Sequence, residues 1–144
     1  MSKVQEAVEC FNNGFNCSQA VFSTYCEQFG LDRKSGLKIA GGFGGGMGRQ
    51  GEICGAITGA YMLIGLKHGK SEKADDEARE KTYELVQEFS HRFRERNRYI
   101  GCRELLGVDI MIGDKNILNE KFKVLCPQMV RDAAEILEEI MEIK

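Results

Sequence analysis

The chain has 144 residues, of which 42% are hydrophobic and 29% are charged, and its formal net charge is −2. This length fits one domain spanning residues 1–144, and the composition excludes a disordered or fibrous protein. With so small a net charge we expect no nucleic acid and no anionic membrane surface among the partners.

Apolar residues in the first 40 positions recur at helical spacing, without the alternation typical of strands. The spacing predicts a first helix from Val4 to about Asn13. Asn16 can cap a second helix that ends before Gly30, antiparallel to the first, and a short helix is expected over 34–40.

A glycine-rich segment follows at 41–51, where seven of eleven residues are glycine. Next comes a predicted helix from about Ile53 to Lys67 that is apolar nearly all round, as a central helix must be. It is too short to cross a bilayer, so we expect no membrane insertion. Gly55 and Gly59 lie on one of its faces, where they would let a neighbouring backbone approach closely.

The second half of the chain is expected to be helical as well. Ser71 can cap a long helix that runs to about Asn97, and the stretch 99–125 reads as short helical turns joined by loops. Cys126-Pro127 would open the last helix, since proline is tolerated at the first helical position. The fold class is therefore all-α: a helical bundle of about five main helices with short helical turns and a glycine-rich loop.

Four of the six cysteines, Cys17, Cys54, Cys102 and Cys126, lie where the sequence predicts the first turn of a helix. Unpaired amides and a partial positive charge at such a turn favour the thiolate. We therefore hypothesise a depressed pKa for Cys54, which follows the glycine-rich segment. The backbone and side chain that could form an anion-binding site beside it belong to Gly44, Gly45, Gly46, Gly48 and Arg49. Cys10 and Cys26 have apolar neighbours and are interpreted as buried packing residues.

The string Cys54-Gly55-Ala56-Ile57-Thr58-Gly59 resembles the Cys-Gly-Ala-x-x-Gly signature of the C_GCAxxG_C_C family of redox-active proteins. The segments at 16–21 and 46–49 and the chain length also fit this family. Its four defining cysteines fall, by type and order, on Cys17, Cys54, Cys102 and Cys126, and the resemblance covers roughly residues 14–130. It implies a redox role for these cysteines and names no substrate.

Three functions remain open at this point. In the first, Cys54 attacks a small sulfur compound or the disulfide of a partner protein and Cys17 resolves the mixed disulfide, as in a thiol-dependent oxidoreductase. In the second, Cys17, Cys54, Cys102 and Cys126 bind zinc or an iron–sulfur cluster for electron transfer or sensing, although their separations of 37, 48 and 24 residues are unlike those of zinc fingers. In the third, the cysteines only pack, in an interaction module that forms a homodimer.

The N-terminal residues 1–6 lead directly into an amphipathic pattern and do not resemble a signal peptide, so we expect a cytoplasmic protein. In a reducing cytosol the cysteines would be reduced, catalytic or metal-bound rather than permanently crosslinked.

Overall fold

The computed structural model describes residues 1–143 and confirms the all-α fold class, with no strand among these residues. The helices of eight residues or more are α1 (Val4–Asn12), α2 (Cys17–Tyr25), α3 (Arg33–Ala40), α5 (Gly55–His68), α6 (Asp76–Asn97) and α8 (Lys115–Met141). The shorter elements are the 3₁₀ turns η1 (Cys26–Phe29) and η2 (Gly41–Phe43) and the turns α4 (Gly44–Met47) and α7 (Cys102–Leu106).

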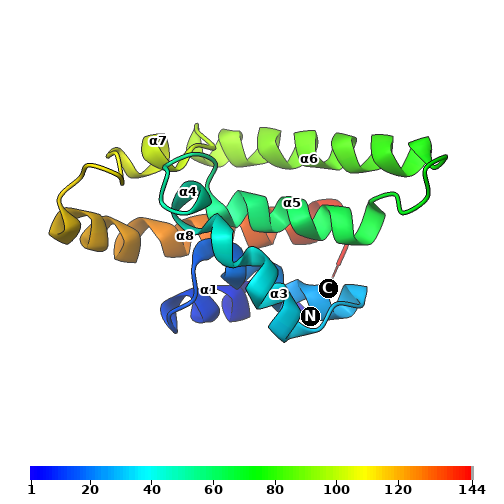
Figure 1. Ribbon diagram of the computed structural model, residues 1–144, viewed down its shortest axis with the longest axis horizontal. Coiled ribbons are helices and arrows are strands. Elements are labelled where there is room, and N and C mark those ends of the chain that lie inside the picture. The colour runs from blue at the N-terminus through cyan, green and yellow to red at the C-terminus, as the bar shows by residue number, and fades with distance from the viewer. Residues whose placement is uncertain (144) are drawn as a thin grey trace.

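The helices are arranged in three tiers (Figure 1). α6 and α7 lie along one side, α5 and α8 form the middle, and α1 and α3 lie on the opposite side. α2 packs against α1, α3, α5 and α8 and so joins the middle tier to this last side.

α5 is the central helix, as its apolar sequence predicts: Ile57, Leu63 and Ile64 have no exposed surface. Two of its three glycines, Gly55 and Gly59, let it touch the start of α2. A Cβ on Gly59 would lie 2.8 Å from the carbonyl oxygen of Ser18, and one on Gly55 would lie within 3.1 Å of the Ser18 amide nitrogen. The Cys-Gly-Ala-x-x-Gly string is thus also a helix-packing surface.

α2 begins with the capping box that Asn16 predicts. The Gln19 amide donates to Asn16 Oδ1 at 2.9 Å, and the Asn16 amide donates to Gln19 Oε1 at 3.0 Å. The same two side chains donate to the carbonyls of Gly41 and Leu37, at 3.2 and 3.0 Å. The start of α2 is thereby fixed to α3 and to the first residue of the glycine-rich segment.

The predicted start of α6 at Ser71 is wrong, because Asp75 is the N-cap and accepts a hydrogen bond from the Ala78 amide at 3.1 Å. Asp76 and Glu77 add negative charge to the first turn. Three acidic residues complement the helix dipole better than an uncharged serine does.

The predicted start of the last helix at Cys126-Pro127 is also wrong. α8 begins at Lys115, where Asp114 accepts hydrogen bonds from the amides of Asn116 and Ile117, and Pro127 lies inside the helix. Proline removes one backbone hydrogen bond, to the carbonyl of Lys123, but Lys123 is exposed and water can hydrate that carbonyl. The expected loops and turns therefore cover only the residues between α6 and α8.

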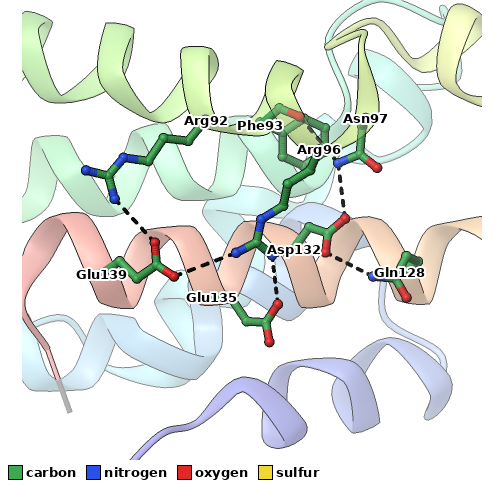
Figure 2. Close-up of polar contacts among 8 residues, drawn as sticks. All are labelled: Arg92, Phe93, Arg96, Asn97, Gln128, Asp132, Glu135 and Glu139. Carbon is green, nitrogen blue, oxygen red and sulfur yellow. Dashed lines mark hydrogen bonds and ion pairs between the residues drawn. The ribbon is translucent and has the colours of Figure 1, made fainter.

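A polar cluster joins α6 to α8 (Figure 2). Asp132 is 6% exposed and accepts hydrogen bonds from Arg96 at 3.2 Å, Asn97 at 3.1 Å and Gln128 at 2.9 Å. Arg96 also pairs with Glu135 at 2.8 Å. The buried carboxylate is therefore fully hydrogen-bonded, as a buried charge must be.

Candidate functional site

Cys17, Cys54, Cys102 and Cys126 line one cavity of about 440 Å³. All four thiols are free, and their residues are between 5% and 7% exposed, so reagents reach them only through the cavity. Cys17 and Cys102 are the first residues of α2 and α7, and Cys54 is the N-cap of α5. Cys126 instead lies in the interior of α8, so the predicted helix start holds for three of the four.

A single antiparallel β-bridge, between Ile53 and Gly101, brings Cys54 and Cys102 together. The Cys54 amide donates to the carbonyl of Ile100 at 2.9 Å, and the Cys102 amide donates to that of Glu52. Side chains alternate across such a bridge, so Cys54 and Cys102 lie on the same face as diagonal neighbours.

The Arg103 side chain strengthens this connection, since it donates to the Gly51 carbonyl at 3.2 Å and pairs with Glu52 at 2.8 Å.

The glycine-rich segment contains a left-handed turn. The five consecutive residues from Gly45 to Arg49 all have φ between +66° and +67°, and the Gly48 amide donates to the Gly44 carbonyl at 2.8 Å. Residues with a side chain lose roughly 1–2 kcal/mol each in this conformation, which explains the choice of glycine at most of these positions. Met47 and Arg49 adopt it without that advantage.

Four of the five predicted anion-binding residues, Gly44, Gly45, Gly48 and Arg49, line the cavity. Gly46 does not: it is buried, and a Cβ there would lie 2.7 Å from Cys102 Cβ, so Gly46 makes room for Cys102. Anion binding itself stays a prediction.

The rest of the cavity wall is mostly apolar, and these residues were not predicted from the sequence. It is formed by Phe11, Leu105, Leu106, Phe122 and Met129. Phe122 and Met129 flank Cys126 at helical spacing, four residues before it and three after it. This spacing could have identified them, had the sequence been interpreted as one helix through Pro127. Among the described residues, Arg49 is the only one in the wall with a positively charged side chain.

The hypothesis of a depressed pKa at Cys54 is wrong. Burial raises the pKa of this thiol to about 12 and outweighs the lowering effect of hydrogen bonds from the amides of Ala56 and Ile57. Burial and the neighbouring thiols of Cys54 and Cys126 likewise raise the pKa of Cys102 to about 12. The backbone amides at the start of α5 do stabilise the Cys54 thiolate, but its removal from water destabilises the thiolate by more.

Cys126 is the thiol whose pKa is lowered, because the Cys17 thiol donates a hydrogen bond to its thiolate. The same hydrogen bond, together with burial, raises the pKa of Cys17 well above its usual range. Within this pair Cys17 therefore holds the proton and Cys126 ionises first.

The other two cysteines lie outside the cavity, and their predicted burial is confirmed. Cys10 Sγ is 3.8 Å from Ser23 Oγ, and Cys26 Sγ is 3.7 Å from the Ser23 carbonyl oxygen. Cys26 packs against Gly36, where a Cβ would lie 2.6 Å from its sulfur.

Residues 1–143 contain no group of three or more histidine, cysteine, aspartate or glutamate side chains arranged to hold a metal ion. The zinc or iron–sulfur alternative thus stays a prediction without a ligand geometry in its favour. Within the same residues no helix has the length and apolar character needed to span a membrane.

The fold and the cavity define a helical protein with four thiols around one small chamber. The family model described as "Putative redox-active protein (C_GCAxxG_C_C)" matches residues 15–140, so the chain belongs to this family. The family assignment supports a redox role in general terms. Comparison with curated proteins and with solved structures finds no match.

Proposed function

We propose that this protein carries out thiol–disulfide exchange in the four-cysteine cavity, with Cys126 as the attacking thiolate and Cys17 as the resolving thiol. The observation that supports this most directly is that four free thiols line one cavity, where a hydrogen bond from Cys17 lowers the pKa of Cys126. Cys126 takes the attacking role predicted for Cys54, because the pKa of Cys54 is raised. The cytoplasm, which keeps thiols reduced, is the compartment that suits this chemistry.

The reaction has two steps. The Cys126 thiolate attacks one sulfur of a disulfide R–S–S–R, forms a mixed disulfide and releases R–S⁻. This thiolate takes the proton of Cys17, whose sulfur then attacks the Cys126 sulfur, forms the Cys17–Cys126 disulfide and releases the second R–S⁻. The protein loses two electrons to the substrate, and an external thiol reductant returns it to the starting state.

Cys54 and Cys102 remain protonated during these steps, since the pKa of each is raised to about 12. Their thiols are neighbours across the β-bridge, and we assign them no step in the first exchange.

The test is thiol counting on the reduced protein after addition of one equivalent of a small disulfide. We expect loss of two of the six thiols per chain, and peptide mapping should find Cys17 linked to Cys126. Cys17→Ser and Cys126→Ser should each abolish the internal link. Cys10→Ser, at a buried thiol outside the cavity, is the matched control and should leave it intact. A link between Cys54 and Cys102 alone, or no paired loss, would contradict the proposal.

A further inference from the structure

We infer that the substrate of this site is a small disulfide with an apolar body and a carboxylate, and that Arg49 binds the carboxylate. This inference rests on the proposed function and names the class of substrate for it. Three features of the cavity carry it: an arginine without an acidic partner, a strained backbone that places this arginine, and an apolar wall of small-molecule size.

Arg49 is exposed at the cavity wall. Its guanidinium makes no hydrogen bond or ion pair with any residue of the part of the chain that the structure describes. By contrast, Arg96 and Arg103 pair with carboxylates at 2.8 Å. No aspartate or glutamate among the described residues lines the cavity, so a ligand carboxylate can pair with Arg49 without displacing a side-chain carboxylate.

The backbone conformation of Arg49 disfavours an arginine, since its φ is +67°. Glycine would adopt this conformation without cost. A Cβ on Gly45 would lie 2.9 Å from Arg49 Cγ, so the bare Gly45 backbone leaves room for the stem of the arginine. Among the described residues that have a side chain and a positive φ, Arg49 alone lines the cavity, and backbone strain at such a place is typical of functional sites.

The size of the cavity, about 440 Å³, falls in the range of small-molecule sites, roughly 300–1,000 Å³. Phe11, Phe122 and Met129 can cover an aromatic or aliphatic body. The four thiols are reached only through this chamber, so a compact disulfide molecule suits it better than a disulfide on the surface of a folded partner.

Two aromatic disulfides test the inference: dithiodinicotinic acid and its neutral parent, dithiodipyridine. The rate at which each disulfide releases its aromatic thiol on reaction with the protein is divided by its rate with a neutral free thiol, 2-mercaptoethanol, which removes the difference in intrinsic reactivity. The wild-type protein should react faster, on this normalised scale, with dithiodinicotinic acid than with dithiodipyridine. Arg49→Gln should reduce this preference by about three- to tenfold, the range expected for a partly exposed charged hydrogen bond, and Arg49→Lys should keep most of it.

Arg98→Gln is the matched control, because Arg98 also has a positive φ, +73°, and lies outside the cavity against Tyr99. Its variant should behave as the wild type. Unchanged preference in Arg49→Gln, with Cys17–Cys126 still forming, would overturn the role of Arg49 and leave the proposed function standing.

Binding is measured separately with the thioether analogue of dithiodinicotinic acid, which cannot exchange. Calorimetry should show tighter binding to the wild type than to Arg49→Gln even if thiol exchange fails. Equal affinity for the two proteins would overturn the inference whatever the chemistry.

Discussion

Burial and hydrogen bonding act in opposite directions on the thiols of the cavity. At Cys54 two backbone amides stabilise the thiolate, yet burial raises the pKa to about 12. At Cys126 the hydrogen bond from Cys17 outweighs burial and lowers the pKa. The reactive sulfur, that of Cys126, is therefore determined by a hydrogen bond from the neighbouring Cys17 thiol and not by the start of a helix.

This difference predicts the order of alkylation with pH. Only the thiolate reacts, so the group with the lowered pKa reaches half-maximal rate at a lower pH. Cys126 should reach it below the usual cysteine value of 9.0, whereas the rate at Cys54 should keep rising toward about pH 12. Pulsed alkylation with mass spectrometry of each peptide gives both midpoints.

Cys17→Ala should raise the midpoint of Cys126, because the variant loses the hydrogen bond that stabilises the thiolate. Cys10→Ser should leave it unchanged. A midpoint of Cys54 below that of Cys126 would show that the wrong thiol has been assigned as the nucleophile.

For single residues, the sequence predicted which cysteines line the cavity but did not predict how burial changes their pKa values. The resemblance selected the four cavity cysteines and left out Cys10 and Cys26. The raised pKa of Cys54 could not be foreseen, because desolvation depends on helices packed over it from distant parts of the chain. The positive φ of Met47 and Arg49 also follows no local rule, since side chains disfavour it.

Among the elements, α5 depends on two glycines for its contact with α2, while a third glycine in the same helix has no such role. A Cβ on Gly59 would lie 2.8 Å from the Ser18 carbonyl oxygen, whereas one on Gly65 meets nothing within 4 Å. Gly59→Ala should therefore destabilise the protein by about 1–3 kcal/mol, as overpacking does. Gly65→Ala should stabilise it by about 0.5–1 kcal/mol through helix propensity.

Urea unfolding of the two variants measures these changes as shifts of the midpoint at constant slope. Because both substitutions add one methyl group to the same helix, the pair separates packing from propensity. Equal effects of the two substitutions would show that α5 and α2 are not in backbone contact.

The polar cluster between α6 and α8 should contribute to the free energy of unfolding mainly through Asp132. Asp132→Ala removes the acceptor shared by Arg96, Asn97 and Gln128 and should cost about 1–3 kcal/mol. Glu139→Ala removes an acceptor whose side chain is 54% exposed, so its effect should stay within about 0.5 kcal/mol. Thermal unfolding of both variants tests this, and similar losses would argue against a buried role for Asp132.

Helix boundaries could be predicted where a local signal decides them. Asn16 and its capping box fix the start of α2, and the apolar run fixes α5. Pro127 misled the prediction, because the rule for the first helical turn is local. The part of α8 before Pro127 is stabilised by burial of Leu118 and Cys126 against the rest of the molecule, which the sequence alone does not show.

For the whole molecule, the convergence of the four cysteines could be predicted only as a hypothesis. Cys17 and Cys126 meet because α2 packs against α8, and Cys54 and Cys102 meet through one β-bridge. Separations in sequence carry no information about such contacts, so the pairing within the cavity required the structure.

The pairing of Cys17 with Cys126 has a consequence for the stability of the whole chain. A disulfide between them would close a loop of about 110 residues, and a loop of this size stabilises the folded state by about 4–5 kcal/mol in the chain-entropy account, less any strain. The oxidised protein should therefore unfold at a higher temperature and a higher denaturant concentration than the reduced protein. Cys17→Ser should show no such difference between oxidising and reducing conditions, whereas Cys10→Ser should show the full one. A crosslink between α2 and α8 must restrict the unfolded chain across most of its length. Equal stability of the oxidised and reduced wild type would therefore mean that oxidation links other sulfurs.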